Sequence, residues 1–378
     1  MDYDDSADEA TFRRELHTWL AANDPGPAPP ISDSAAEHEY KKRWQQQLYA
    51  GGWLGLSWPE EYGGRGLNPF YEAILNEELG AAGVAHAAPP VGWLGRAILA
   101  YGSEEQRRRH LPGLLSGETS WCQGFSEPGA GSDLASLRTF AERSGDGYSI
   151  TGQKLWTSGA QFADWCLLLA RTARDGPKHQ GISAFTVRMS TPGITVRPFK
   201  QAWGGTRFCE VFLDGAEVPV TDRVGEEGDG WPLATVVLAY ERGPSELGPV
   251  GGDDAELGRA ELRDLVGRSA GDAVAEDALA RAYVAVEACR LHLLESLTRR
   301  VKGEAPGPGT SVDKLLMIRA EQALGTLELD AAATAGITGE PWATPSRYLW
   351  SRAASVYGGS EQIQRNIVAQ RVLGLPRR

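Results

Sequence analysis

Cysteine is scarce in this sequence, and so are the other features that mark a disulfide-rich or metal-binding protein. Four cysteines occur among 378 residues, and no two of them form a Cys-x-x-Cys pair. No histidine stands at metal-ligand spacing from any of them, so the sequence predicts no metal site and four free, buried thiols. These are Cys122, Cys166, Cys209 and Cys289.

Long apolar runs and an excess of basic residues are also missing. No stretch approaches the roughly 18 apolar residues of a membrane span, and the N-terminus is acidic where a signal peptide is basic. We therefore expect a cytoplasmic protein without a membrane partner. The formal charge of −12 also disfavours nucleic acid and anionic lipid as partners. An anionic substrate is still allowed where arginines cluster locally.

What the sequence does have is a change of pattern along the chain. Apolar residues at helical spacing, such as Phe12, Leu16 and Leu20, predict helices in the N-terminal third. Short β-rich runs follow and predict a small sandwich or barrel, at 148–151, 165–170, 182–187, 194–198 and 208–213. From Trp231 the pattern is helical again, with long helices expected over 274–297 and 313–332.

This order of helices, strands and helices indicates an α+β fold in three parts. The predicted domains are an α-helical domain over 1–121, a β domain over 122–228 and a helical domain over 229–378. Two breaks rich in glycine and proline, 243–252 and 303–309, interrupt the last of them.

A glycine-rich segment joins the first two domains. Gly124-Phe-Ser-Glu-Pro-Gly-Ala-Gly-Ser-Asp133 combines glycines with hydroxyl and carboxylate side chains. Such a segment can turn its backbone N–H groups toward an anion or a polar ring edge. It is not G-x-G-x-x-G, and no strand-loop-helix context surrounds it, which excludes a Rossmann dinucleotide site. From these residues alone, a tight turn between domains is the simpler interpretation.

Together with three further segments, it resembles the acyl-CoA dehydrogenase family over nearly the whole chain. The segments follow the family's order and are Trp58-Pro-Glu-Glu-Tyr-Gly-Gly64, Gly152-Gln-Lys-Leu-Trp-Thr-Ser158 and Tyr357-Gly-Gly-Ser-Glu-Gln-Ile-Gln-Arg-Asn366. The resemblance implies an N-terminal α-helical domain, a middle β-sandwich or barrel domain and a C-terminal four-helix bundle. It also implies FAD as cofactor and a thioester of CoA or acyl carrier protein as substrate.

The resemblance assigns roles residue by residue. Positions that match the family's contacts with the isoalloxazine ring, pyrophosphate and ribose are Gln123, Phe125, Ser126, Gly131, Ser132, Trp156, Thr157, Ser158, Ser360, Glu361 and Gln362. Positions that match substrate contacts are Ser132, Arg242, Tyr357, Gly358 and Gly359. For Trp156, the alternative is an ordinary core aromatic residue.

Dehydrogenation between Cα and Cβ requires a base for the α-proton and a hydride acceptor on the opposite side of the bond. Many family members carry the catalytic glutamate directly after the tyrosine that matches Tyr357, where this chain has Gly358. The backbone N–H of that glycine can still stabilise a developing oxyanion.

Another branch of the family, which includes the isovaleryl enzyme, carries its glutamate in a Glu-Arg pair on a C-terminal helix. Tyr240-Glu-Arg242 stands at the matching place, which makes Glu241 the candidate base. Gly243-Pro244 follows and is expected to bend or end the helix beside the carboxylate. The alternatives are a solvated glutamate in a salt bridge and a solvated arginine.

Some features depart from the family pattern and leave the assembly open. Segments 269–276 and 333–339 lack the family's motifs for the flavin adenine. The pattern resembles actinobacterial members of steroid or polyketide metabolism, some of which are heterotetramers, so a homodimer, homotetramer or heterotetramer is expected. His179 is expected to be a loop histidine and not a base.

The resulting functional hypothesis is oxidation of a saturated acyl thioester to the trans-2-enoyl thioester, with electrons passing on to an electron-transfer flavoprotein. Two alternatives stand beside it. The first is an oxidase of the same fold whose flavin is reoxidised by oxygen. The second is a non-catalytic subunit that completes the flavin site of a partner.

Overall fold

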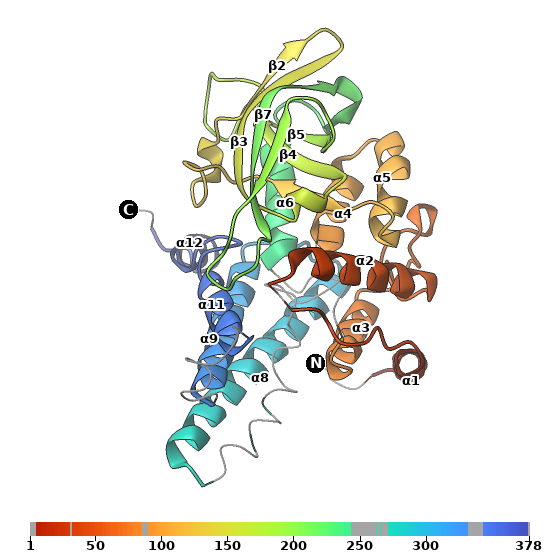
Figure 1. Cartoon of the computed structure of the whole chain (residues 1–378), viewed down its shortest axis with the longest axis vertical. Coiled ribbons are helices and arrows are strands. Elements are labelled where there is room, and N and C mark those ends of the chain that lie inside the picture. The colour runs from red at the N-terminus through yellow and green to blue at the C-terminus, as the bar shows by residue number, and fades with distance from the viewer. Residues whose placement is uncertain are drawn as a thin grey trace.

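The computed structural model describes residues 5–30, 32–84, 90–242, 262, 266, 271–331 and 343–376. A β-sheet forms one end of the molecule, the N-terminal helices lie at its side, and the C-terminal helices extend from its other end (Figure 1). No helix in these ranges combines the length and apolar character that crossing a membrane requires. The predicted break at 243–252 and the segment 333–339 lie outside the described residues, whereas the predicted break at 303–309 is the loop and turn before the helix that begins at Thr310.

The N-terminal helices are α1 (Ala7–Ala22), α2 (Ser34–Ala50), α3 (Phe70–Ala81), α4 (Pro90–Tyr101) and α5 (Glu104–Ser116). Capping boxes begin two of them, with Ser6 paired to Glu9 at α1 and Ser103 paired to Gln106 at α5. Phe12, Leu16 and Leu20 are buried on one face of α1, as their spacing predicts.

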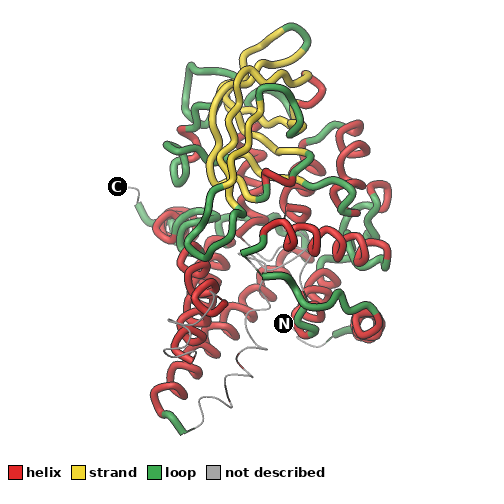
Figure 2. The backbone as a smooth tube through the Cα atoms, in the orientation of Figure 1, coloured by secondary structure: helices red, strands yellow, loops and turns green. Residues whose placement is uncertain are grey.

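The described strands form a single sheet of eight, seen as the yellow tube in Figure 2. They are β1 (Trp121–Gly124), β2 (Phe140–Ser144), β3 (Gly147–Ser158), β4 (Trp165–Arg171), β5 (Ile182–Arg188), β6 (Ile194–Pro198), β7 (Phe208–Pro219) and β8 (Arg223–Val224). The strand order is β6-β7-β3-β2-β4-β5-β8, and β1 pairs with β4 in parallel.

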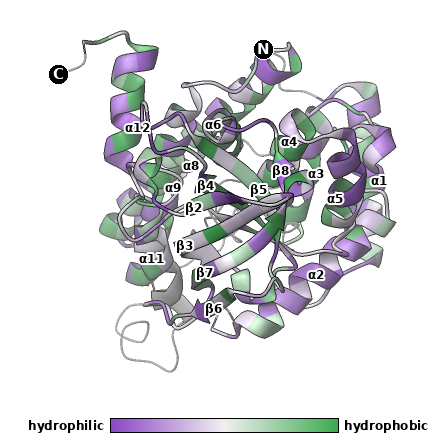
Figure 3. Ribbon diagram, turned by 90° about the horizontal axis from the view of Figure 1, so that it is seen from above, coloured by the Kyte–Doolittle hydropathy of each residue, from purple (hydrophilic) through white to green (hydrophobic). Residues whose placement is uncertain are grey.

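The sheet is buried on both faces, and strand β4 shows why. Leu167 and Leu169 face a core shared with the N-terminal helices, while Cys166 and Leu168 face a second core inside the sheet. The second core joins side chains from β3, β4, β5 and β7, so the sheet curves around it. Seen from above, the strands lie between the N-terminal helices and α9, α11 and α12 (Figure 3).

The C-terminal helices are α6 (Gly230–Arg242), α8 (Ala273–Val301), α9 (Thr310–Ala331), α11 (Ala343–Ala353) and α12 (Glu361–Ile367), and a π-helical turn follows at Val368–Val372. Helix α6 inserts Leu233, Ala234 and Val237 into the core beneath the sheet. Helices α8 and α9 pack around their own apolar core. Because α6 is fixed along its length, its last residues, Glu241 and Arg242, take a defined position.

Candidate functional site

The glycine-rich loop that follows β1 is held by a buried ion pair. The Glu127 carboxylate accepts hydrogen bonds from Lys154 Nζ at 2.8 Å, from Arg138 N at 2.6 Å and from Thr139 N at 2.9 Å. Lys154 Nζ also donates to the Phe125 carbonyl at 3.1 Å. Although burial alone would raise it, the pKa of Glu127 lies below its usual range because of Lys154 and these donors. The loop is thereby fixed to strand β3.

Trp156 occupies a strained position on that strand. Its φ is +62°, the left-handed region that L-residues other than glycine seldom adopt, at a cost on the order of 1–3 kcal/mol. The pairing of β3 with β7 shifts register between Lys154 and Thr157, so Trp156 lies in a β-bulge. Its side chain is 55% exposed, which contradicts the alternative of a core aromatic residue. Strain that aims an apolar ring outward is typical of a binding surface.

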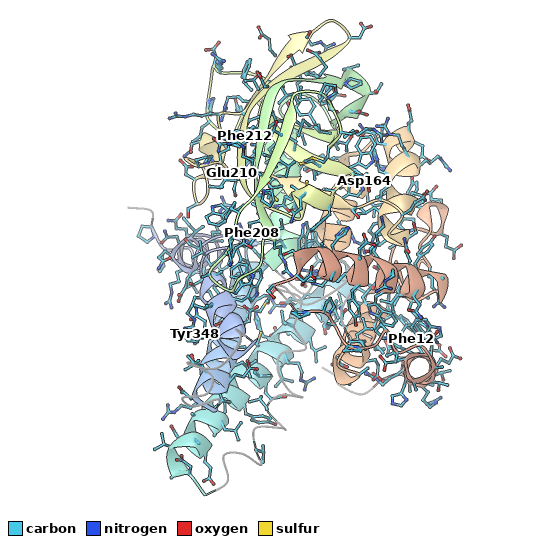
Figure 4. The ribbon with its side chains drawn as sticks, in the orientation of Figure 1. Phe12, Asp164, Phe208, Glu210, Phe212 and Tyr348 are labelled. Carbon is cyan, nitrogen blue, oxygen red and sulfur yellow. The ribbon has the colours of Figure 1, made fainter. Side chains whose placement is uncertain are left out.

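A series of ring contacts connects Trp156 to the C-terminal helices. Its ring lies edge-on to Phe208, with centroids 5.7 Å apart, and Phe208 stacks on Trp350 of α11 at 6.1 Å. Trp350 in turn lies 6.0 Å from the ring of Tyr357. Figure 4 shows Phe208 at the end of β7 nearest these helices, with Glu210 and Phe212 farther along the strand. The exposed tryptophan and the Tyr357 segment therefore share one surface.

Glu241 lies at the C-terminal end of α6, where its carboxyl group is shielded from water. Its Oε2 is buried and makes no hydrogen bond within the described part of the chain. The Gln123 side chain, from strand β1, lies near this carboxyl group. Burial raises the pKa of Glu241 above its usual range, and Arg242, Lys314 and Gln123 offset part of the rise. Glu241 is therefore not the solvated glutamate in a salt bridge that the sequence allowed.

The segment that follows Tyr357 is fixed beside this carboxyl group. The Gly358 carbonyl accepts from Arg242 Nε at 2.8 Å and from Gln364 Nε2 at 2.9 Å. Gly358 and Gly359 have φ of +63° and +91°, conformations that glycine adopts without strain. Arg242 is thus engaged in the site and is not a solvated arginine. Ser360 then caps α12 by accepting from Ile363 N.

The structure brings some of the predicted residues together and leaves others at the surface. Gln123, Glu241, Arg242, Gly358 and Gly359 form one cluster from three separate parts of the chain. Exposed predicted residues are Gly131, Ser132, Trp156, Ser158 and Gln362. The Thr157 hydroxyl is buried and makes no hydrogen bond with any described residue. Glu361 pairs with Arg365 one turn farther along α12.

The sequence reasoning missed two residues of this cluster, Lys314 and Gln364. Both are buried, and both contact the Gly358–Gly359 segment. Each lies in a predicted helix, where a long polar side chain is usually solvated, and no local pattern distinguishes them. The one available signal concerns Gln364, which follows the predicted site residue Ser360 by one helical turn.

The expectations for the cysteines and for His179 agree with the structure. All four cysteines are free and buried. His179 lies exposed between β4 and β5, with its ring edge-on to Trp231 at 4.6 Å. Within the described ranges, no three His, Cys, Asp or Glu side chains gather where they could hold a metal ion.

Family models match the chain in three consecutive parts. The N-terminal domain model of acyl-CoA dehydrogenase matches residues 6–118, the middle domain model residues 122–216, and the C-terminal domain model residues 228–373. Acyl-CoA dehydrogenase IpdE1 of Mycobacterium tuberculosis is 40% identical over 383 residues, covering 98% of each chain. The resemblance and the three-part fold predicted from the sequence are therefore confirmed.

Two solved structures share the fold over its full length. A structure described as the Tcur3481-Tcur3483 steroid ACAD has a TM-score of 0.84 at 30% identity, covering 100% of both chains. The ChsE4-ChsE5 complex from Mycobacterium tuberculosis has a TM-score of 0.83 at 29% identity, with the same coverage. Both are described as pairings of two named components.

Proposed function

This chain belongs to the acyl-CoA dehydrogenase family, and we propose that it oxidises a saturated acyl thioester to the trans-2-enoyl thioester with Glu241 as the base. Membership confirms the predicted class, an oxidoreductase acting on a CH–CH group, and the predicted cofactor, FAD. The base, the substrate and the electron acceptor are the proposed part.

The observation that carries the proposal is the environment of Glu241. A carboxylate in water is a weak base, whereas one removed from water has a raised pKa and a stronger pull on a proton. Glu241 is half-buried at a helix end, and its Oε2 atom is buried and has no hydrogen-bond donor among the described residues. The neighbouring cations Arg242 and Lys314 favour its ionised form, which is the form a base requires.

The chain's own residues fit the flavin. FAD, when bound, supplies the hydride acceptor for the reaction. We propose that the exposed ring of Trp156 offers a flat apolar surface for the isoalloxazine, and the buried Thr157 hydroxyl has hydrogen-bonding capacity to spare. A Cβ at Gly129 or Gly131 would meet nothing within 4 Å, so the loop has open space beside it. We propose flavin contacts for Gln123, Phe125, Ser126, Gly131, Ser132, Trp156, Thr157, Ser158, Ser360, Glu361 and Gln362.

The Tyr357–Gly359 segment is proposed to hold the thioester. Removal of an α-proton places negative charge on the thioester oxygen, which hydrogen-bond donors must stabilise. The two hydrogen bonds from Arg242 and Gln364 go to the carbonyl of Gly358 and fix the orientation of this peptide. They do not use the Gly358 N–H, which is proposed as one donor. Ser132, Arg242, Tyr357 and Gly359 complete the proposed substrate contacts.

We further propose that the chain works in a heteromeric assembly on a polycyclic acyl thioester. Support comes from the two similar structures, one described as a steroid ACAD and one as a complex. Helix α8 also exposes apolar side chains of the kind that a subunit interface covers, including Val274, Tyr283 and Val284. In such an assembly the shielded carboxyl group of Glu241 favours a catalytic role for this chain over a purely structural one.

Replacement of Glu241 by glutamine tests the proposed base. With the flavin-loaded enzyme and a panel of saturated acyl-CoA thioesters, we expect Glu241→Gln to slow bleaching of the oxidised-flavin absorbance about 100-fold or more. Glu142→Gln, on the exposed edge of β2, is the matched control and should keep the wild-type rate. If Glu241→Gln bleaches as fast as wild type, another group is the base.

Two simpler measurements separate the alternatives. Air reoxidation that is rapid and releases peroxide would favour an oxidase over a dehydrogenase that uses an electron-transfer flavoprotein. A chain that is colourless when purified alone, and yellow only with a second acyl-CoA dehydrogenase subunit, would show that the flavin site is shared. Bleaching that is then unaffected by Glu241→Gln would identify a non-catalytic subunit.

A further inference from the structure

Lys314, in the first turns of helix α9, is a charged residue in an unusual place. Its side chain is 1% exposed, and its Nζ makes no hydrogen bond within the described part of the chain. The ammonium group lies over the ring of Tyr357, 3.9 Å from the ring centre. A cation–π contact recovers only part of the free energy that burying a cation costs. The ring alone therefore does not account for the buried charge.

The negatively charged Glu241 lies near the same glycine, Gly358, as Lys314 does. A Cβ placed on Gly358 would be 3.5 Å from Glu241 Oε1 and 3.9 Å from Lys314 Nζ. The carboxyl group from α6 and the ammonium group from α9 therefore both lie beside Gly358, each within 4 Å of one point. Glycine leaves the space between them open, so their charges act on each other through a medium of low polarity.

The other charged groups at this point are already engaged. Arg242 donates to the Gly358 carbonyl. Glu321, on α9, accepts from the Tyr357 hydroxyl at 3.3 Å and also favours the charged form of Lys314. Asp313, the preceding residue, accepts from Ser296 Oγ and His292 Nε2 on α8. Burial lowers the pKa of Lys314 to about 8, while Glu321 and Glu241 oppose that fall. The two carboxylates therefore favour the ammonium form of Lys314 against the effect of burial.

We propose that Lys314 is a positioning residue that keeps Glu241 ionised, with Tyr357 holding the ammonium group and Gly358 leaving room for its charge to act. This inference rests on the proposed role of Glu241 and extends it. Burial makes the carboxylate a stronger base but also favours its neutral form, which cannot take a proton. A buried cation beside Gly358 restores the ionised form without donating a hydrogen bond, which would weaken the base.

The pH dependence of flavin bleaching tests the inference. Lys314→Met keeps the length of the side chain and removes the charge. An opposite charge within about 4–6 Å lowers a carboxyl pKa by roughly 1–3 units, so we expect the acidic limb of the rate profile to move up by about one unit or more. The rate at high pH should stay near that of wild type. Lys314→Arg keeps the charge and should leave the limb in place.

A control variant and a second measurement show whether misfolding or loss of activity could explain a shifted rate profile. Lys302→Met, at the exposed end of α8, should not move the profile. The Glu241 carboxyl band, obtained by infrared difference between wild type and Glu241→Gln, should titrate at a higher pH in the Lys314→Met background, with or without turnover. Because the infrared titration needs no turnover, it also applies to a variant whose bleaching rate is too low to measure.

The possible outcomes distinguish the role of Glu241 as the base from the role of Lys314 in keeping it ionised. If Glu241→Gln abolishes bleaching while Lys314→Met moves neither the rate profile nor the carboxyl band, Glu241 is the base and Lys314 has no part in its ionisation. If Glu241→Gln bleaches normally, the proposed base is wrong, whatever Lys314 does. A shift of equal size in Lys314→Arg would show that packing and not charge is responsible.

Discussion

The loop region, residues 124–158, and the helix-end region, made of Gln123, Glu241, Lys314 and Gly358, meet at one site but are built in opposite ways. In the loop region the buried charges are satisfied, since Glu127 accepts from Lys154 and from two backbone N–H groups. In the helix-end region Glu241 Oε2 and Lys314 Nζ are buried without hydrogen bonds to any described residue. Buried charged groups that are hydrogen-bonded hold the chain in one conformation. Buried charged groups without hydrogen bonds instead change one another's affinity for protons.

This difference matches the two tasks proposed for the regions. A cofactor surface must keep its form, and the strained Trp156 keeps its left-handed backbone only because the network beneath it is rigid. A base must instead have a proton affinity that its surroundings adjust. The three predictions below test the division, beginning with the largest effect.

Removing Lys154 should damage the loop region most. Lys154→Met leaves the buried Glu127 carboxylate without its cation, which in comparable cases costs about 3–5 kcal/mol. We expect a loss of that size in the free energy of unfolding, measured by urea denaturation at neutral pH. Flavin content should fall as well, because the Phe125 carbonyl loses its donor.

A double variant shows whether the lost charge balance is the cause. Glu127→Gln in the Lys154→Met background removes the uncompensated charge and keeps an acceptor oxygen for one of the two N–H groups, so part of the stability should return. A double variant as unstable as the sum of the two single variants would mean that packing, and not the ion pair, holds the loop.

A buried carboxyl group outside both regions offers a reference for Glu241. Glu72, on α3, is fully buried, and burial raises its pKa to about 8, against a hydrogen bond from Ser57 N and the charge of Arg96. Since the folded pKa lies above the unfolded value, Glu72 contributes stability below about pH 4.5 that is lost as pH rises toward 8. Glu72→Gln removes this dependence.

We therefore expect Glu72→Gln to match wild type near pH 4 and to exceed it by on the order of 1–3 kcal/mol above pH 8. Thermal unfolding of the two proteins across this range measures the difference. A difference that does not vary with pH would mean that the pKa of Glu72 is the same in the folded and the unfolded chain, and that burial alone does not neutralise a carboxyl group in this fold. The proposed need for Lys314 beside Glu241 would then weaken.

Sequence reasoning reached the loop region more completely than the helix-end region, for a physical reason. The loop's main residues are contiguous or lie on one strand, so a motif such as Gly124–Asp133 contains them. Lys314 and Gln364 are buried by packing between segments far apart in the chain, which no local pattern records. Glu241 was found through its Glu-Arg pair, but its burial against Gly358 and Gln123 was not predictable.

The same reasoning explains the elements that were missed. Strand β2, Phe140–Ser144, has charged residues where an apolar alternation would mark a strand, and it owes its form to pairing with β3. Strand β8 has two residues and pairs with β5 alone. The long helices α8 and α9 were predicted within a few residues, because an amphipathic pattern over many turns needs no partner to be recognised.

The smallest expected effect on stability concerns Trp156, and it separates shape from function within the loop region. Trp156→Gly relieves the left-handed strain but makes the unfolded chain more flexible, so the two terms nearly cancel and the unfolding free energy of the flavin-free protein should change by less than about 1 kcal/mol. Flavin retention should nevertheless fall about tenfold, because an aromatic face is worth roughly 0.5–1.5 kcal/mol beyond its buried area. Trp156→Phe keeps a ring and should retain most of the flavin. Equal flavin affinity in wild type and Trp156→Gly would show that the exposed indole is not part of the cofactor surface.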